Sequence, residues 1–192
     1  MTGQASDDIA SRLDQLESRQ ALRDLVSLYC VACDDHDLDT VVSLFTEDGV
    51  FRNPDNSAFI KGHDAILSMF VGSHDFMRLT NHWIHDHLVT FEGPDAATGL
   101  ALGHIEANLS GTAVVGAFRY YDKYVRQQGK WLFEERRIEF LYYTPVAEFA
   151  TALDSVNRVI GANGMVEADY PEKLESWKFW KAKQVAAAAA KA

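Results

Sequence analysis

The chain has 192 residues, 47% of them hydrophobic and 24% charged, with 12 Gly and 4 Pro, a composition that is typical of a globular domain and excludes a disordered or fibrous chain. Eighteen Lys and Arg stand against 28 Asp and Glu, which gives a formal net charge of −10. With that charge and no basic stripe along the sequence, nucleic acid and anionic lipid are disfavoured as partners.

The N-terminal residues and the cysteines bear on the compartment. The first eight residues are mostly polar or acidic and contain no apolar segment, and no run approaches the roughly twenty apolar residues of a membrane span. Cys30 and Cys33 are the only cysteines and lie within a predicted helix as core-facing neighbours. We therefore expect a cytoplasmic protein in a reducing compartment, with no membrane partner. CxxC redox chemistry is the alternative, disfavoured because no βαβ unit surrounds the pair.

The N-terminal third has the periodicity of helices. Apolar residues recur at three- and four-residue steps over residues 8–33, which predicts one long amphipathic helix. The same spacing over 38–45 and 63–70 predicts two shorter helices.

The middle of the chain changes to β-forming sequence. Short turns separate four runs of such residues, at 87–91, 97–109, 112–125 and 131–143. Connections of hairpin length indicate an antiparallel sheet. Helices followed by a meander predict an α+β fold, with a curved sheet and a helix across its concave side.

The last 50 residues are expected to be helical. Apolar residues at helical spacing predict a helix over 145–160, a break at 161–164, and a last helix over 171–185. We therefore divide the chain into an α+β domain, residues 1–150, and a C-terminal helical extension, residues 151–192. Its two tryptophans would pack on the domain or on a neighbouring subunit.

A cluster of histidines lies where helix gives way to sheet. His82, His85 and His87 could bind a metal together with His104 and Glu106, but no zinc spacing is present and alternating strand positions face opposite sides. An imidazole paired with a carboxylate could instead serve as a general base. The third interpretation is that these histidines are solvated side chains at a strand edge.

Several segments together resemble one family. Each segment alone is a weak signal, but they occur in a shared order and spacing. They are residues 16–25 with Tyr29, 33–37, 45–51, the turn 61–62, Asn81-His82, Tyr124 and 129–133. In this order they resemble the SnoaL-like branch of the NTF2-like α+β cone superfamily, and within it the cofactor-free lyases: hexachlorocyclohexane dehydrochlorinase, scytalone dehydratase and bile-acid dehydratase.

The resemblance implies a catalytic set. A His at the start of a strand abstracts a proton in those lyases, and an Asp at the end of the first helix pairs with it; these positions fall on His82 and Asp34. The helix Tyr that helps hold a departing oxygen falls on Tyr29, and an Arg of the last strand falls on Arg136. The family needs neither cofactor nor metal.

The resemblance also implies a pocket for a small hydrophobic cyclic substrate. The dehydratases' second His corresponds to His104, and Phe51 and Trp83 are expected to contribute to the lining. The Ser and Asn that hold the substrate in the fungal dehydratase fall on Phe118 and Tyr120, which indicates a substrate unlike scytalone.

Each of these residues also has a structural interpretation. Tyr29 lies on the apolar stripe of its helix and could be core. Arg136 and Arg137 adjoin several Glu and point to opposite faces of their strand, so only one can face the interior. Asp35 could replace Asp34 as the partner of His82. We predict that an imidazole nitrogen of His82 lies within hydrogen-bond reach of one of these two carboxylates.

The sequence therefore predicts a cofactor-independent lyase, a dehydratase or dehydrohalogenase that removes HX, most simply water, by His-Asp general base catalysis. Three alternatives stay open: a ketosteroid-isomerase-like proton shuttle with an Asp base, a non-catalytic small-molecule-binding protein, and a structural subunit of an oxygenase. The charged outer face of the sheet suggests a homo-oligomer, and the resemblance implies a trimer.

Overall fold

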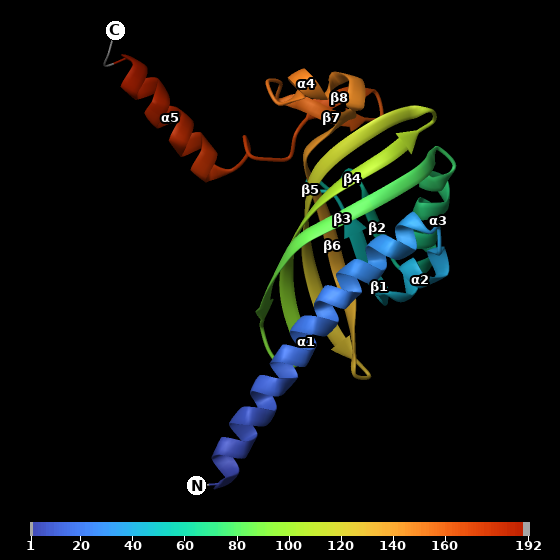
Figure 1. Ribbon diagram of the computed structural model, residues 1–192, viewed down its shortest axis with the longest axis vertical. Helices are drawn as coiled ribbons and strands as arrows, with labels where there is room; N and C mark the ends of the chain where they lie inside the picture. Colours follow the sequence, from blue (N-terminus) through green and yellow to red (C-terminus); the bar gives the residue numbers. More distant parts are fainter. Residues whose placement is uncertain (1, 190–192) are drawn as a thin grey trace.

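A curved sheet with helices on its concave side forms the body of the protein, in a computed structural model that describes residues 2–189 (Figure 1). The helices are α1 (Thr2–Asp34), α2 (Leu38–Ser43), α3 (His63–His74), the 3-10 turn η1 (Val146–Glu148), α4 (Phe149–Ala152) and α5 (Glu175–Ala189). The strands are β1 (Phe45–Arg52), β2 (Phe59–Lys61), β3 (Met77–Phe91), β4 (Ala96–Leu109), β5 (Thr112–Gln127), β6 (Lys130–Pro145), β7 (Asn157–Gly161) and β8 (Gly164–Glu167).

The sheet is built around a meander of long strands. Its main path runs β2-β1-β6-β5-β4-β3, and β7 with β8 joins beside β6. The pairs are antiparallel except β1 with β6 and β6 with β7, which are parallel. Long strands in one sheet twist and curl, and the concave side of this sheet holds α1. The structure thus confirms the predicted α+β fold with a curved, unclosed sheet.

Small residues on the inner face of β4 make room for large ones beside them. Gly103 pairs with Phe118 and Ala101 pairs with Tyr120 across β4 and β5. Phe118 and Tyr120 are each only 2% exposed. The α1 side chains that cover them, among them Leu22 and Tyr29, are equally buried. The core is therefore a layer of aromatic rings between α1 and the sheet.

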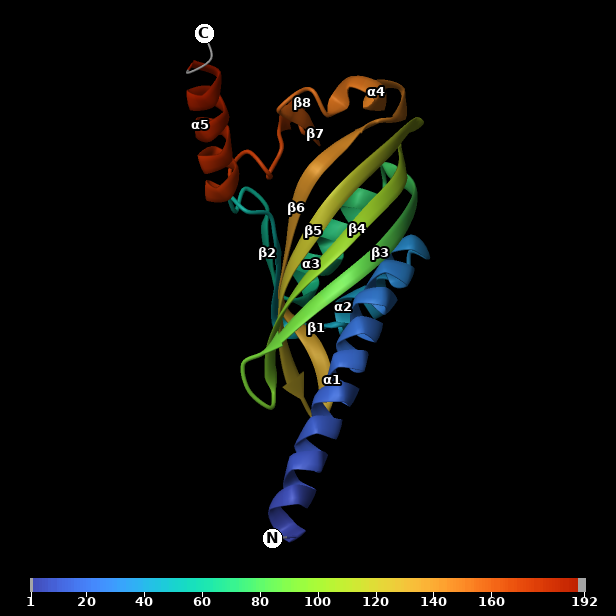
Figure 2. The ribbon, with the colours of Figure 1, turned by 60° about the vertical axis from the view of Figure 1, so that its left-hand side comes forward.

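Two predicted elements extend further than expected. The strand predicted to begin at residue 87 begins at Met77, so all three clustered histidines lie on β3. The helix α1 continues beyond the sheet at its N-terminal end (Figures 1 and 2). Leu13 and Leu16, which the periodicity placed on the buried stripe, are 53% and 65% exposed. Asp14 and Ser18 of the same turns instead face the sheet and contact Arg126 of β5.

The predicted helix over residues 145–160 is wrong. Only η1 and α4 are helical there, and they are followed by the β7–β8 hairpin. The apolar residues that suggested a buried helix face are largely exposed, with Val146 at 51% and Leu153 at 58%. Instead β7 pairs with β6 at Tyr143 and Val159, so the segment after residue 150 is partly sheet rather than wholly helical.

The helix α5 projects away from the body (Figures 1 and 2). Its Trp177 and Trp180 rings pack against each other, with centroids 5.0 Å apart. Phe179 is 64% exposed. Among residues 2–189, no helix is both long enough and apolar enough to span a bilayer.

The close contact between Gly103 and Phe118 gives a stability prediction. A Cβ at residue 103 would overlap the Phe118 ring and approach Ile84. We expect Gly103→Ala to lower the free energy of unfolding by about 1–3 kcal/mol, because the buried ring has to move. Gly93→Ala is the control, since no atom lies within 4 Å of its Cβ position. Chemical denaturation of both variants tests the packing, and equal stabilities would contradict it.

Candidate active site

The C-terminal end of α1 meets the first half of β3 inside the cone. The helix ends at Asp34, directly after the buried Cys33. On β3, Thr80 and His82 lie two residues apart and so point to the same face. That face is the inner one, because Thr80 is only 5% exposed.

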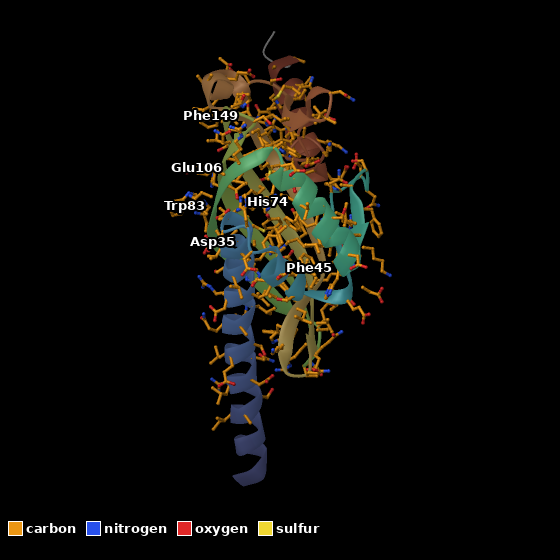
Figure 3. All side chains as sticks on the ribbon, turned by 90° about the vertical axis from the view of Figure 1, so that its right-hand side faces the viewer. Asp35, Phe45, His74, Trp83, Glu106 and Phe149 are labelled. Carbon is orange, nitrogen blue, oxygen red and sulfur yellow. The ribbon has the colours of Figure 1, made fainter. Side chains whose placement is uncertain are left out.

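Asp34 accepts three hydrogen bonds from β3. Thr80 Oγ1 donates to Oδ1 at 2.9 Å, the His82 backbone N–H donates to Oδ2 at 2.7 Å, and the His82 Nδ1 lies 2.6 Å from Oδ1. The Asp34 side chain is 17% exposed and that of His82 is 10% exposed. The predicted contact between His82 and a carboxylate is confirmed, with Asp34 as the partner. Asp35 is exposed and lies at the end of α1 (Figure 3).

This geometry fixes the tautomer that His82 has in its neutral form. Burial by itself raises the pKa of Asp34, but the hydrogen bonds from His82 and Thr80 outweigh it and hold the pKa below its ordinary value. An ionised Asp34 accepts the Nδ1–H of His82, which leaves the lone pair of a neutral imidazole on Nε2. Beside this ring lies Phe118, with centroids 6.0 Å apart and the planes at 72°.

A second polar group is buried deeper in the cone. The Arg136 guanidinium is 0% exposed and binds Asp122 through two hydrogen bonds, at 2.9 and 2.7 Å. It lies 4.2 Å from the ring of Tyr29 and 4.0 Å from those of Tyr120 and Phe133. Burial alone would lower the pKa of Arg136, but the Asp122 carboxylate raises it, so the side chain stays charged. Its Nη1 has no hydrogen-bond partner among the described residues.

The polar cluster continues to His87. Tyr124 donates its hydroxyl to Asp122 at 2.7 Å, and His87 Nε2 lies 2.9 Å from the Tyr124 oxygen. His87 therefore donates from Nε2, and its Nδ1 is buried without a partner in the described chain. Burial lowers the pKa of His87 to about 4, so this ring is neutral at pH 7.

The histidine cluster is thus divided between the two faces of β3. His82 faces inward, whereas His85 is exposed and lies 2.6 Å from His104 on the outer face. A register shift between Ile84 and His87 turns His87 inward again. Within the part of the chain described, no three His, Cys, Asp or Glu side chains are arranged to hold a metal ion.

The prediction that Trp83 and His104 line the pocket is wrong. The two residues are paired across β3 and β4, on the face opposite to His82. Trp83 is 56% exposed and projects from the outer side (Figure 3). The strand begins earlier than predicted, so adjacent residues 82 and 83 have opposite orientations.

The structure brings the other predicted residues to the interior. Phe118 contacts His82, and its centroid lies 4.7 Å from that of Tyr120. Tyr120 and Tyr29 both contact Arg136. Phe51 joins this core through Phe70, at 6.1 Å. These residues form one continuous aromatic wall from the dyad to the guanidinium.

Two polar residues of the interior were missed from the sequence, Thr80 and Asp122, while His87 was considered as a metal ligand and Tyr124 only as part of the family resemblance. The first has a usable signal, because a strand starting before residue 80 places it on the same face as His82. The pair of Asp122 with Arg136 follows from the β5–β6 register, which the hairpin turn 127–130 could have given. His87 has no such signal, since the irregular stretch of β3, residues 84–87, contains no Gly or Pro.

Comparisons with known proteins agree with this architecture. The family model for the SnoaL-like domain matches residues 14–137. A hexachlorocyclohexane dehydrochlorinase, LinA type 2, is 23% identical, with TM-score 0.66 over 70% of this chain and 93% of that one. Another LinA structure is 25% identical, with TM-score 0.67 over 71% and 95% of the two chains. A scytalone dehydratase-like protein from Novosphingobium aromaticivorans is 19% identical, with TM-score 0.65 over 69% and 89%. None of the curated proteins matches the sequence.

Neutral His87 makes stability depend on pH. The unfolded chain takes up this proton near pH 6.5 and the folded chain only near pH 4, so folding stability falls as pH is lowered between these values. The pKa shift of His87 limits this loss in the free energy of unfolding to about 3 kcal/mol, and solvent screening of the partly exposed ring makes it smaller. In urea denaturation between pH 7 and 4, the free energy of unfolding should decline less steeply with falling pH for His87→Gln than for the wild type. Equal slopes would show that His87 is not held neutral.

The buried ion pair gives a second stability prediction. Asp122→Asn keeps the shape of the side chain but leaves the Arg136 charge without its counter-ion, which should cost about 3–5 kcal/mol. Asp95→Asn is the matched control, because it breaks the exposed pair with Arg126, at 2.8 Å, and should cost less than about 1 kcal/mol. Denaturation of both variants measures the difference, and a loss at Asp122 as small as that at Asp95 would contradict the assignment.

Proposed function

The chain belongs to the SnoaL-like family, and we propose that it is a cofactor-independent lyase, with His82 as the base that removes a proton from carbon. The observation that carries the proposal is the Asp34 carboxylate, which accepts three hydrogen bonds from Thr80 and His82. A base needs one free nitrogen in a fixed direction, and this arrangement supplies it at Nε2.

The chemistry is an elimination. His82 Nε2 takes a proton from a carbon of the substrate, the C–H electron pair forms a double bond, and the leaving group departs with its own electron pair. The imidazolium that forms is stabilised by the ionised Asp34, 2.6 Å from Nδ1. A positioned base contributes about 10²–10⁴ in rate, which suffices when a carbonyl or halogen already acidifies the C–H bond.

The leaving group requires a donor. Burial raises the pKa of Tyr29 well above its ordinary value, so its hydroxyl is protonated and can donate to hydroxide or halide. Arg136, in contact with the Tyr29 ring, adds positive charge at the same depth, and its Nη1 has no partner in the described chain. Both were assigned this part by family resemblance, and their proximity to each other supports it.

The aromatic interior supports a hydrophobic cyclic substrate. Phe118, Tyr120 and Tyr29 offer aromatic ring faces between the dyad and the guanidinium. The similar LinA and scytalone dehydratase-like structures carry names of enzymes that remove HCl or water. We propose the same class of reaction here, with water or halide as the leaving group, and a homotrimer as the assembly.

The structure disfavours Asp34 as the base of a proton shuttle. Three of the roughly four acceptor sites of its carboxylate already accept hydrogen bonds from β3, and these bonds lower its pKa and its strength as a base. His82 has no such constraint at Nε2.

A screen for turnover tests the proposal. We expect water loss from cyclic β-hydroxy ketones, followed by the absorbance of the enone, or halide release from hexachlorocyclohexanes, both unaffected by EDTA. Ligand-induced thermal stabilisation without any turnover on such panels would favour the non-catalytic alternative.

Variants of the dyad identify the base once a substrate is in hand. His82→Gln should lower kcat by about 10²–10⁴, because the general base is lost. Asp34→Asn should also lower kcat, since the amide cannot stabilise the imidazolium. His85→Gln is the control, because this residue lies on the outer face, and it should retain activity. Full activity of His82→Gln would overturn the proposal.

A further inference from the structure

Within the described chain, one edge of β6 has no neighbouring strand over residues 138–142. Its neighbour β1 pairs with β6 only as far as Arg137, and β7 begins to pair only at Tyr143. Between them Asp169 takes the place of a strand: Phe140 N–H donates to its Oδ2 at 2.9 Å, and its own N–H donates to the Phe140 carbonyl at 3.0 Å. The edge of β6 is therefore satisfied by one residue instead of a strand, which leaves space on either side.

A cavity of about 560 Å³ occupies this space. One wall is β6 with the β7–β8 hairpin and the segment that follows it, and the other is the loop between β1 and β2, from Asn53 to Ser57. Ligand pockets in proteins have volumes of about 300–1,000 Å³, so this one is large enough for a molecule of one or two rings.

The floor of the cavity is apolar and reaches the proposed active site. Ile138, Phe140, Val159 and Ile160 line it. The Phe140 ring lies 6.2 Å from Phe118, which in turn lies 6.0 Å from His82. Two ring contacts thus connect the floor of the cavity to His82.

The rim is negatively charged. Asp55, Glu167 and Asp169 stand there against one base, Lys173. Lys173 Nζ lies 3.7 Å from Asp169 and 4.0 Å from Glu167. Hydrogen bonds from Ser57 and the charge of Lys173 lower the pKa of Asp55, so this carboxyl is ionised at neutral pH. Three negative charges and one positive charge repel an anionic ligand and admit a neutral or cationic one.

Most of this cavity lies outside the segment shared with the family. The family model ends at residue 137, whereas the floor and the charged rim come from residues 138–173 and the loop 53–57. The hairpin that the sequence pattern misread as helix supplies one wall. Most of the cavity lining therefore comes from residues beyond the matched range.

We propose that this cavity binds the non-reacting part of the substrate, an apolar ring system that is uncharged or cationic and carries no carboxylate or phosphate at that end. The role as part of the substrate site rests on the proposed function, whereas binding of such a ring in the cavity does not. The apolar floor provides the affinity, and the acidic rim selects the charge.

Three naphthalenes of one shape test the charge preference: naphthalen-2-ylmethanol, naphthalen-2-ylmethylamine and 2-naphthoate, titrated into the full chain by calorimetry. We expect the alcohol and the amine to bind at least about tenfold more tightly than the acid. Glu167→Lys, at an exposed position, should reduce the ratio of amine affinity to acid affinity at least about threefold. Equal or tighter binding of 2-naphthoate to the wild type would overturn the proposal.

Substitutions at the rim test the location. Ala162→Trp fills the cavity from the exposed hairpin turn and should weaken binding of the alcohol at least about fivefold. Ala187→Trp on α5 is the matched control and should leave it unchanged. Ser57→Trp, from the opposite wall, should act like Ala162→Trp and serves if that variant does not fold. Binding equal to that of the control in both rim variants would overturn the proposal.

His82→Gln separates this proposal from the proposed function. It should abolish turnover but leave the binding of the naphthalene alcohol intact. If His82→Gln remains fully active while Ala162→Trp weakens binding, the lyase mechanism fails and the cavity stands. If His82→Gln is inactive while the rim variants bind normally, the mechanism stands and the cavity fails.

Discussion

The Asp34 carboxylate connects the end of α1 to the first half of β3, and the geometry of the site depends on that connection. A carboxylate at the C-terminus of a helix faces the negative end of the helix dipole, so the position is unfavourable without compensation. Thr80 and His82 compensate with three donors. The same contact holds the imidazole of His82 in one orientation. Gly103 leaves room for the Phe118 ring. Because that ring contacts His82, the packing at Gly103 also supports the dyad.

The interior has two polar clusters at different depths, and they differ in how completely their atoms are paired. Near the α1 terminus, every oxygen of Asp34 is used. Deeper in the cone, Asp122 receives Arg136 and Tyr124, yet Arg136 Nη1 and His87 Nδ1 are left unpaired within the described residues. Buried polar atoms are nearly always paired in native proteins. In the described chain, Arg136 Nη1 is a free donor, as stabilisation of a transient negative charge requires, and this supports the part proposed for Arg136. The unpaired Nδ1 of neutral His87 carries a lone pair and is an acceptor.

Much of this arrangement could be predicted from the sequence, and the failures have physical causes. Helical periodicity located α1 and α3, and turn residues located β4, β5 and β6. The contact of His82 with Asp34 came from family resemblance. Trp83 and His104 were misplaced because strand parity was not applied to a strand thought to begin later. His87 turns inward at an irregularity in β3, for which alternating polarity gives no signal. Residues 157–160, which form most of β7, were read as helix because Val156 and Ile160 also fit a four-residue spacing, and only pairing with β6 decides between the two.

The long-range pairing that the sequence hides also shapes the part of the chain beyond the family match. The inner faces of the long strands carry the dyad and the aromatic wall, and they belong to the shared domain. The edge of β6 is different, because β1 stops short and β7 starts late. Asp169 satisfies the backbone between them but fills little volume, so the edge stays open to a cavity with an acidic rim. The proposed chemistry thus lies in the segment that matches the family, whereas most of the proposed cavity lies in the C-terminal segment beyond it.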